Sequence, residues 1–222
     1  MQKLRLFIIE SLNPVDMLEG RSEGYALENI CKIFGHDVVH FQAHSRRDLN
    51  QYCDFISSID RRGSSSAPIC IHIAAHGNSE GVQFGRDEIT WEKLFLSLEP
   101  LIKGMNDYKR EVFISISACG AGHQELAGII QSEIRSVPQS RYRGKFYPPE
   151  YIFVTQGSGD LDVTMWNDSA VAWTLFYHRI AKIEGEINQT DIRAILDDIE
   201  ASTDTVVRSF RWNSISKRYR KY

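Results

Sequence analysis

Two apolar segments of the sequence end in residues whose types could do chemistry together. Segment 69–77 reads ICIHIAAHG and ends in His76 and Gly77, while segment 112–120 reads VFISISACG and ends in Cys119 and Gly120. An imidazole beside a thiol can take its proton, which keeps the cysteine as a nucleophilic thiolate. The glycines leave room for a substrate carbonyl, and the backbone N–H groups of Gly77, Cys119 and Gly120 could form an oxyanion hole. The pattern predicts acyl transfer by His76 and Cys119.

These two side chains can meet only if the segments that carry them are neighbouring strands of one sheet. Both segments are nearly continuous apolar runs, which is typical of parallel strands covered by helices on both faces. Strand-like and helix-like segments alternate along the chain, so we predict an α/β fold, a three-layer α/β/α sandwich with a mostly parallel central sheet. In such sheets, reacting groups collect at the carboxyl ends of the strands.

The expected elements follow from apolar periodicity and from capping and turn residues. Ser45 and Thr90 are expected to cap helices, Gly35 is expected to end one, and segment 81–90 reads as a short hairpin or loop. Strands are expected at 4–9, 36–43, 67–77, 110–122 and 151–157, and helices at 23–35, 45–62, 91–104, 123–134, 167–182 and 190–203.

Composition limits the class of protein. A chain of 222 residues with 42% hydrophobic content fits one large domain, which we place at 1–205, followed by a basic aromatic C-terminal tail at 206–222. The net charge of −3 argues against a nucleic-acid partner, and no apolar run reaches the length needed to cross a membrane. The charged N-terminus is no secretory signal and the four cysteines form no C-x-x-C pair, so we expect a cytoplasmic protein with reduced thiols.

The His76-Gly77 pair and the Ser117-Ala118-Cys119-Gly120 element resemble a known family, the caspase-like clan CD cysteine peptidases. This family includes caspases, metacaspases, separases, gingipains and the bacterial CHAT proteins. Ser117 stands where caspases have glutamine and Ala121 where they have a second glycine, so S-A-C-x-x-G, ending in Gly122, is closer to CHAT-type members. The resemblance covers about residues 1–180. It implies a caspase-like fold and a cysteine-type endopeptidase with a Cys119–His76 dyad, without metal or cofactor.

The same resemblance places the substrate's P1 side chain at the end of the strand 151–157. The residues nominated to bind substrate there are Gln156, Ser158, Asp160 and Asp162, with Glu10 and Asp16 contributing from the end of the first strand. Carboxylates in this pocket favour a basic P1 residue through a charge-assisted pair.

Other candidate residues have simpler interpretations. Cys31, Cys53, Cys70 and His72 are expected in the core, because they stand inside apolar elements. His123 competes with His76 as the base but belongs to a helix start. The spacing of His36, His40 and His44 would bind a metal only on a helix, and the segment reads as a strand, so no metal site is expected.

The leading functional hypothesis is a bacterial regulatory or defence protease that cleaves a protein partner encoded nearby and that an activating partner protein could control. The alternative is a catalytically silent caspase-like module for protein interaction. A nucleotide or flavin binder is disfavoured because no glycine-rich phosphate loop follows the first strand. The loop 136–149, with Arg141, Arg143 and Lys145, is a candidate for self-processing if P1 is basic.

Overall fold

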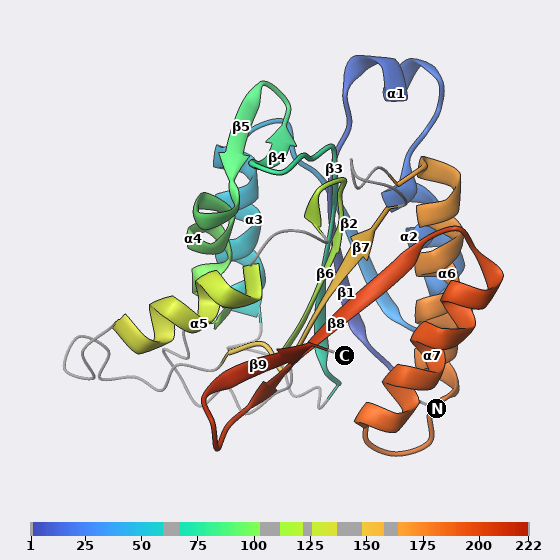
Figure 1. Ribbon diagram of the computed structural model, residues 1–222. Helices are drawn as coiled ribbons and strands as arrows, with labels where there is room; N and C mark the ends of the chain where they lie inside the picture. Colours follow the sequence, from blue (N-terminus) through green and yellow to red (C-terminus); the bar gives the residue numbers. More distant parts are fainter. Residues whose placement is uncertain are drawn as a thin grey trace.

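The computed structural model describes residues 2–59, 67–102, 112–121, 126–136, 148–157 and 164–221, and its main feature is a single seven-stranded sheet between two layers of helices (Figure 1). The strand order is β2-β1-β3-β6-β7-β8-β9, and the first five of these strands run parallel. The predicted three-layer α/β sandwich with a mostly parallel sheet is confirmed. The loop 136–149, nominated for processing, lies almost entirely outside the described residues.

The elements follow the predicted order closely. The strands are β1 (Arg5–Ser11), β2 (Asp37–Gln42), β3 (Ile69–Ala75), β6 (Val112–Ser117), β7 (Tyr151–Gln156), β8 (Val206–Asn213) and β9 (Arg218–Lys221), with β4 (Gly81–Phe84) and β5 (Asp87–Thr90) forming a separate hairpin. The helices are α1 (Pro14–Leu18), α2 (Glu23–Ile33), α3 (Arg46–Ile59), α4 (Trp91–Ile102), α5 (Leu126–Ser136), α6 (Trp166–Lys182) and α7 (Gln189–Ser202).

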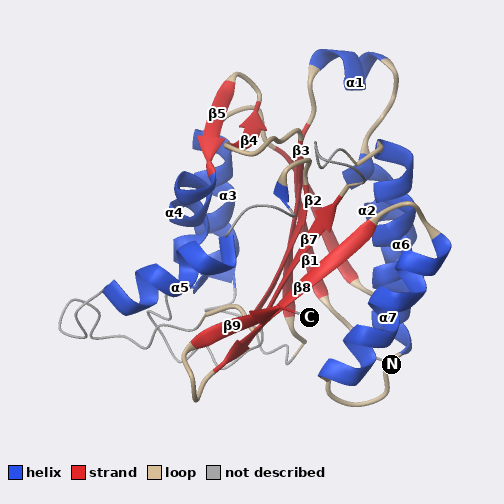
Figure 2. Cartoon of the chain, in the orientation of Figure 1, coloured by secondary structure: helices blue, strands red, loops and turns tan. Residues whose placement is uncertain are grey.

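Two apolar cores, one on each face of the sheet, explain the continuous apolar strands. Helices cover both faces (Figure 2). Successive residues of a strand point to opposite faces. In β1, Phe7 and Ile9 pack against the layer of α3, α4 and α5, whereas Leu6 and Ile8 pack against α2, α6 and α7. Because both faces are covered, every residue of β6 is buried, as is every residue of β1, β3 and β7 except one at a strand end.

Local capping fixes where the helices begin. The Ser45 hydroxyl accepts from the Asp48 N–H at 3.2 Å, and the Thr90 hydroxyl accepts from the Lys93 N–H at 3.3 Å, as the sequence predicted. At the other end of α2, Gly35 follows the C-cap residue Phe34 and has φ of 90°, the left-handed conformation that ends helices.

The basic aromatic segment 206–222 joins the sheet. β8 pairs antiparallel with β7 and places Arg211 opposite Tyr151, and β9 pairs antiparallel with β8 to form the edge. The Arg211 guanidinium lies over the Tyr151 ring and forms an ion pair with Glu150 at 3.2 Å.

Within the described part of the chain, no helix has the length and apolar character that a membrane span requires.

Candidate active site

The register of two central strands brings the ends of the two nominated segments together. β3 and β6 are adjacent and parallel, with His72 opposite Ser115 and Ala74 opposite Ser117. Each strand ends within a residue or two of these pairs, so His76 and Cys119 leave the sheet at the same edge and at the same level. This is the placement that the sequence required of them.

The two loops that carry these residues pack backbone against backbone. A Cβ atom at Gly77 would lie 2.6 Å from the backbone oxygen of Cys119, and one at Gly120 would lie 2.3 Å from the carbonyl carbon of Asn78. Gly120 also has φ of 78°, which favours glycine. The space beside each glycine is therefore filled by the neighbouring loop, whereas the sequence interpretation had assigned it to a substrate carbonyl.

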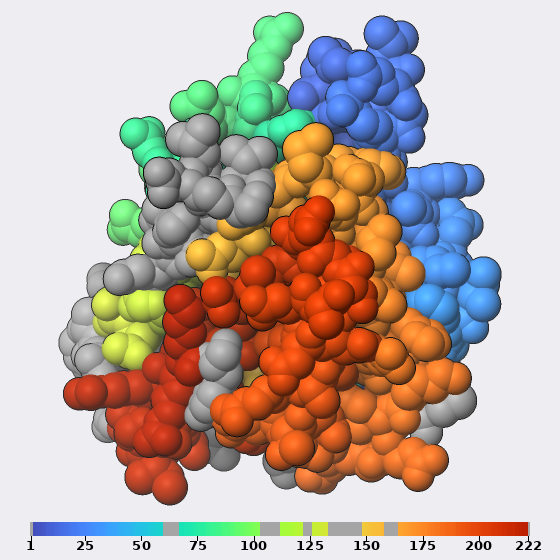
Figure 3. All heavy atoms as spheres, turned by 45° about the vertical axis from the view of Figure 1, so that its right-hand side comes forward, coloured from blue at the N-terminus to red at the C-terminus, as the bar shows by residue number. Residues whose placement is uncertain are grey.

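The β4–β5 hairpin holds the loop that follows His76. The His76 carbonyl accepts from the Gln83 N–H at 2.8 Å, and the Asn78 N–H donates to the Gly81 carbonyl at 2.9 Å. The hairpin and α1 project from the same end of the molecule, on either side of the end of β3 (Figures 1 and 3). The base candidate is thus supported on one side by the hairpin and faces α1 on the other.

His76 and Cys119 line one cavity of about 360 Å³ at this edge of the sheet. Its lining comes from the ends of β1, β3, β6 and β7, from the region of α1 and from the start of α6. The residues are Glu10, Ser11, Leu12, Asn13, Asp16, Arg21, Glu23, Ala74, Ala75, His76, Ser117, Ala118, Cys119, Thr155, Thr164, Met165, Trp166 and Ser169.

The imidazole of His76 is held through one ring nitrogen. Its Nε2 lies 2.5 Å from Oδ2 of Asp16 and 2.9 Å from Nδ2 of Asn13. Asp16 is also paired with Arg21, whose guanidinium lies 3.3 Å from the other carboxylate oxygen. Both of these contacts are made by Nε2 and neither by the second ring nitrogen, Nδ1.

Cys119 differs in its surroundings from the other three cysteines. Cys31, Cys53 and Cys70 are fully buried, as expected for core residues, whereas Cys119 is partly exposed in the cavity. Burial, with a smaller contribution from Cys70, raises the pKa of the Cys31 thiol to about 12, and burial raises the pKa of Cys70 to about 11. Those thiols are poor nucleophiles at neutral pH, because only the thiolate reacts.

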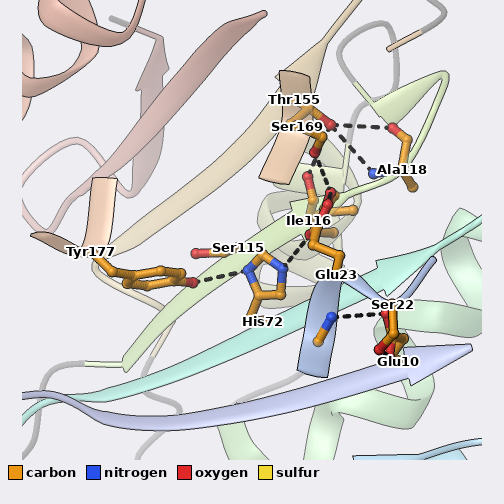
Figure 4. A network of polar contacts seen from close by, with 12 residues as sticks. Glu10, Ser22, Glu23, His72, Ser115, Ile116, Ala118, Thr155, Ser169 and Tyr177 are labelled. Carbon is orange, nitrogen blue, oxygen red and sulfur yellow. Dashed lines mark hydrogen bonds and ion pairs between the residues drawn. The ribbon is translucent and has the colours of Figure 1, made fainter. Parts of the chain in front are cut away.

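A buried polar network includes Ser117, two residues before the nucleophile candidate (Figure 4). The Tyr177 hydroxyl lies 2.9 Å from Nδ1 of His72, whose Nε2 lies 2.9 Å from Oε1 of Glu23. The hydroxyl of Ser117 donates to Oε2 of Glu23 at 2.9 Å and lies 2.7 Å from that of Ser169. One order of donors satisfies every contact: Tyr177 to His72, His72 to Glu23, and Ser169 to Ser117 to Glu23. His72, predicted as a core residue, is fully buried.

This architecture has a counterpart among solved structures. The crystal structure of caspase-1 from Spodoptera frugiperda matches with a TM-score of 0.51 and 14% sequence identity, covering 98% of this chain and 88% of that chain. The fold is caspase-like. No family model matches the sequence, and no curated protein matches it either. At this identity the comparison establishes the fold alone, and the closer likeness to CHAT proteins rests only on the S-A-C-x-x-G pattern.

Within this caspase-like fold, the nominated substrate-binding residues lie in different places. Glu10 lines the cavity but is 1% exposed, and its carboxylate accepts from the Ser22 hydroxyl at 2.6 Å and from the Gly24 N–H at 2.8 Å, with Nε2 of His40 at 3.1 Å. Gln156 is not part of the cavity lining, because its Oε1 accepts from Nε of Arg208 at 2.8 Å across the β7–β8 pair. Ser158, Asp160, Asp162, Gly122 and His123 lie outside the described residues.

Sequence reasoning missed three contributors to the site. The first is the pairing of Asp16 with His76, which the motif Asn13-Pro14-Val15-Asp16 could have suggested, since it is a capping box placed directly after β1. The second is Glu23, which only the packing of α2 against the sheet brings to the end of β6. The third is Thr155, whose hydroxyl accepts from the Ala118 N–H at 3.3 Å and ties β7 to the residue before Cys119.

Proposed function

We propose that this caspase-like chain is a cysteine-type endopeptidase in which Cys119 is the nucleophile and His76 the general base and acid. The observation that carries the proposal is the convergence of a partly exposed thiol and a held imidazole on one cavity at the carboxyl ends of adjacent parallel strands. Perturbed or converging reactive groups in such a cavity are the usual mark of an active site.

The chemical steps follow from the two side chains. His76 takes the thiol proton of Cys119, and the thiolate sulfur then bonds to the carbonyl carbon of the scissile peptide. Backbone N–H groups of Gly77, Cys119 and Gly120 are the candidates to stabilise the resulting oxyanion. The C–N bond breaks as the amine takes the proton back from His76, which leaves a thioester on Cys119. Water deprotonated by His76 hydrolyses this thioester and restores the thiol.

The charge of the cavity supports a preference for a basic P1 residue. Glu10, Asp16 and Glu23 are among the described residues that line it, and Arg21 is the single arginine or lysine among them. Each of these carboxyl groups already has partners within the fold, so they would favour a lysine or arginine at P1 through their combined field rather than through a direct pair, and would disfavour an acidic one. The competing feature is Arg21 itself, whose buried Nε atom has no hydrogen-bond partner among the described residues and could receive an acidic P1.

A smaller hollow of about 200 Å³ lies between His76 and the β4–β5 hairpin, and His76 lines both spaces. The acyl half of the substrate stays on Cys119, whereas the amine half departs with the proton from His76. The geometry therefore favours the larger cavity for the residues before the scissile bond and the smaller hollow for those after it.

The biological setting is proposed on the resemblance of the residue pattern alone. A regulatory or defence protease of a bacterial cytoplasm would act on a protein partner encoded nearby, and an activating partner protein would control it. Gene neighbourhood and copurification of substrate with the Cys119→Ala protein would test this setting.

Active-site labelling and a peptide library test the chemistry. We expect a peptidyl acyloxymethyl ketone with lysine at P1 to label the wild-type protein on Cys119, with the site identified by peptide mass spectrometry. Cys119→Ala and His76→Ala should both abolish cleavage of a library peptide while the proteins stay folded, and Cys70→Ala should retain cleavage. A folded wild-type protein that neither labels nor cleaves would favour the catalytically silent interaction module, and cleavage after aspartate would assign the P1 contact to Arg21.

A further inference from the structure

The exposed side chain of His76 is paired with a buried carboxylate. Its side chain is 52% exposed, yet Asp16 beside it is only 9% exposed and is held on several sides. An imidazole at the rim of a cavity would sample several orientations without such a partner. The buried carboxylate of Asp16 therefore restricts the orientation of the His76 imidazole.

Only one of the two groups at Nε2 can form its hydrogen bond in a given tautomer. The side-chain oxygen of Asn13 accepts from the Asp16 N–H at 2.8 Å, which fixes the amide so that its Nδ2 faces the ring. If Nε2 carries the proton, it donates to Asp16; if it does not, it accepts from Asn13 and its lone pair faces the carboxylate. The carboxylate oxygen of Asp16 lies nearer to Nε2 than Nδ2 of Asn13 does, which favours the first arrangement.

Helix α1 keeps Asp16 in place. Asn13 and Asp16 form a reciprocal capping box, in which the Asn13 side chain accepts from the Asp16 N–H and Oδ2 of Asp16 accepts from the Asn13 N–H at 3.4 Å. Pro14 at the first helical position presets the backbone angle there. The same oxygen of Asp16 thus serves the cap and His76, so the carboxylate cannot turn away without breaking the cap.

We propose that Asp16 is a positioning residue that fixes His76 with its proton on Nε2, so that the site works as a Cys119–His76–Asp16 triad. This inference rests on the proposed peptidase function. With Nε2 committed to Asp16, Nδ1 accepts the thiol proton and later returns it to the leaving amine. The carboxylate stabilises the imidazolium that exists between these two steps, and it gives up no proton itself.

Kinetics of matched variants provide the first test. Asp16→Asn keeps the size of the side chain and an oxygen for the cap but removes the charge, and we expect it to lower kcat about 10- to 1,000-fold with little change in KM. Glu19→Gln is the control, because Glu19 is a carboxylate at the end of α1 that pairs with Arg21 and does not contact His76. Equal kcat in Asp16→Asn and Glu19→Gln, with the wild-type protein active, would overturn the triad and leave the peptidase assignment standing.

The tautomer of His76 provides a test that needs no activity. We would label histidine with ¹⁵N in the Cys119→Ala background, which cannot form a thiolate–imidazolium pair, assign His76 by comparison with His76→Gln, and record spectra at a pH where the ring is neutral. The proposal predicts a proton on Nε2, and its loss or partial transfer to Nδ1 in Asp16→Asn. A proton on Nδ1 in the Asp16-containing protein, or no change on substitution, contradicts it. If the wild type cleaves no peptide, the peptidase function fails, and this measurement still decides the role of Asp16.

Discussion

The backbone of Gly120 packs against the backbone of Asn78, so the residue after the nucleophile candidate touches the loop that follows the base candidate. A Cβ at position 120 would lie 2.3 Å from both the carbonyl carbon and the carbonyl oxygen of Asn78. Neither partner is the end of a flexible side chain. The separation of the two loops is therefore set by two glycines, and any side chain there must push the thiol and the imidazole apart.

Gly120→Ala tests this relationship, with Gly185→Ala as its matched control. Both glycines have positive φ, at 78° and 88°, but nothing lies within 4 Å of a Cβ at Gly185. Alanine costs about 1 to 2 kcal/mol of backbone strain at either position. Only Gly120→Ala should also lose peptidase activity and slow the alkylation of Cys119 by iodoacetamide. Equal activity of the two variants at equal urea midpoints would show that the loop contact does not position the site.

The buried network that includes Ser117 predicts that the effects of substituting His72 and Glu23 on stability are coupled. His72→Phe removes the donor to Glu23 and leaves that carboxylate buried with the Ser117 hydroxyl, which should destabilise the protein by about 3 to 5 kcal/mol. Adding Glu23→Gln to His72→Phe should recover part of this loss, because a neutral amide replaces the unpaired charge. Urea unfolding of the two single variants and the double variant measures the coupling. Simple addition of the two single effects would mean that the pair is not coupled.

Stability at alkaline pH should depend on the three core cysteines. Their thiols have raised pKa values in the folded protein, to about 12 for Cys31 and about 11 for Cys70, and burial raises that of Cys53 further. Unfolded thiols lose their protons near pH 8.5, so above that pH the unfolded state binds fewer protons than the folded one. The stabilisation is complete below about pH 8.5 and is lost as the pH rises toward 11 and 12.

Urea midpoints measured from pH 8 to pH 10.5 under reducing conditions give this slope. We expect Cys53→Ala to lower the absolute stability through its cavity and also to flatten the fall with pH, whereas Cys119→Ala should keep the wild-type slope. Identical slopes for these two variants would mean that the buried thiol does not contribute. Tyr177 and Tyr219, whose pKa values burial also raises, add a fall of the same sign at the upper end of the range.

Self-processing of the loop 136–149 stays a prediction from the sequence. If P1 is basic, the wild-type protein should acquire new termini after Arg141, Arg143 or Lys145, and the Cys119→Ala protein should not. Intact-mass and N-terminal peptide analysis of the two purified proteins distinguishes these outcomes. An uncut wild-type chain with full peptidase activity would remove processing from the mechanism.

The order and type of the main elements could be predicted because each depends on local pattern. Apolar runs such as 69–75 and 112–117 indicated buried parallel strands, and Ser45 and Thr90 marked the starts of their helices. The meeting of His76 and Cys119 then followed from one further step, the adjacency of their strands. These inferences needed only the periods of helix and strand and the rule that reactive groups gather at strand ends.

The rest depends on contacts between residues distant in sequence. No pattern in the neighbouring sequence indicates the hydrogen bond between Glu23 on α2 and Ser117 on β6. The same is true of the contact between His40 on β2 and Glu10 on β1. The basic aromatic tail 206–222 was predicted to be either an edge strand or a solvated segment, and the structure shows two strands, β8 and β9, at the edge of the sheet. Gly77 and Gly120 were predicted to leave room for a substrate carbonyl. The sequence does not show that another loop occupies the space beside them.

Helix α1 combines a residue that contacts His76 with exposed apolar residues that can be substituted separately. Its N-cap Asn13 and its residue Asp16 hold His76, while Val15, Met17 and Leu18 are 54%, 55% and 88% exposed. None of these three residues lines the cavity, so their side chains can change without altering its walls. A surface contact that controls the site could therefore arise or be lost by substitutions within the five residues of α1. The same segment could be used to engineer such a contact.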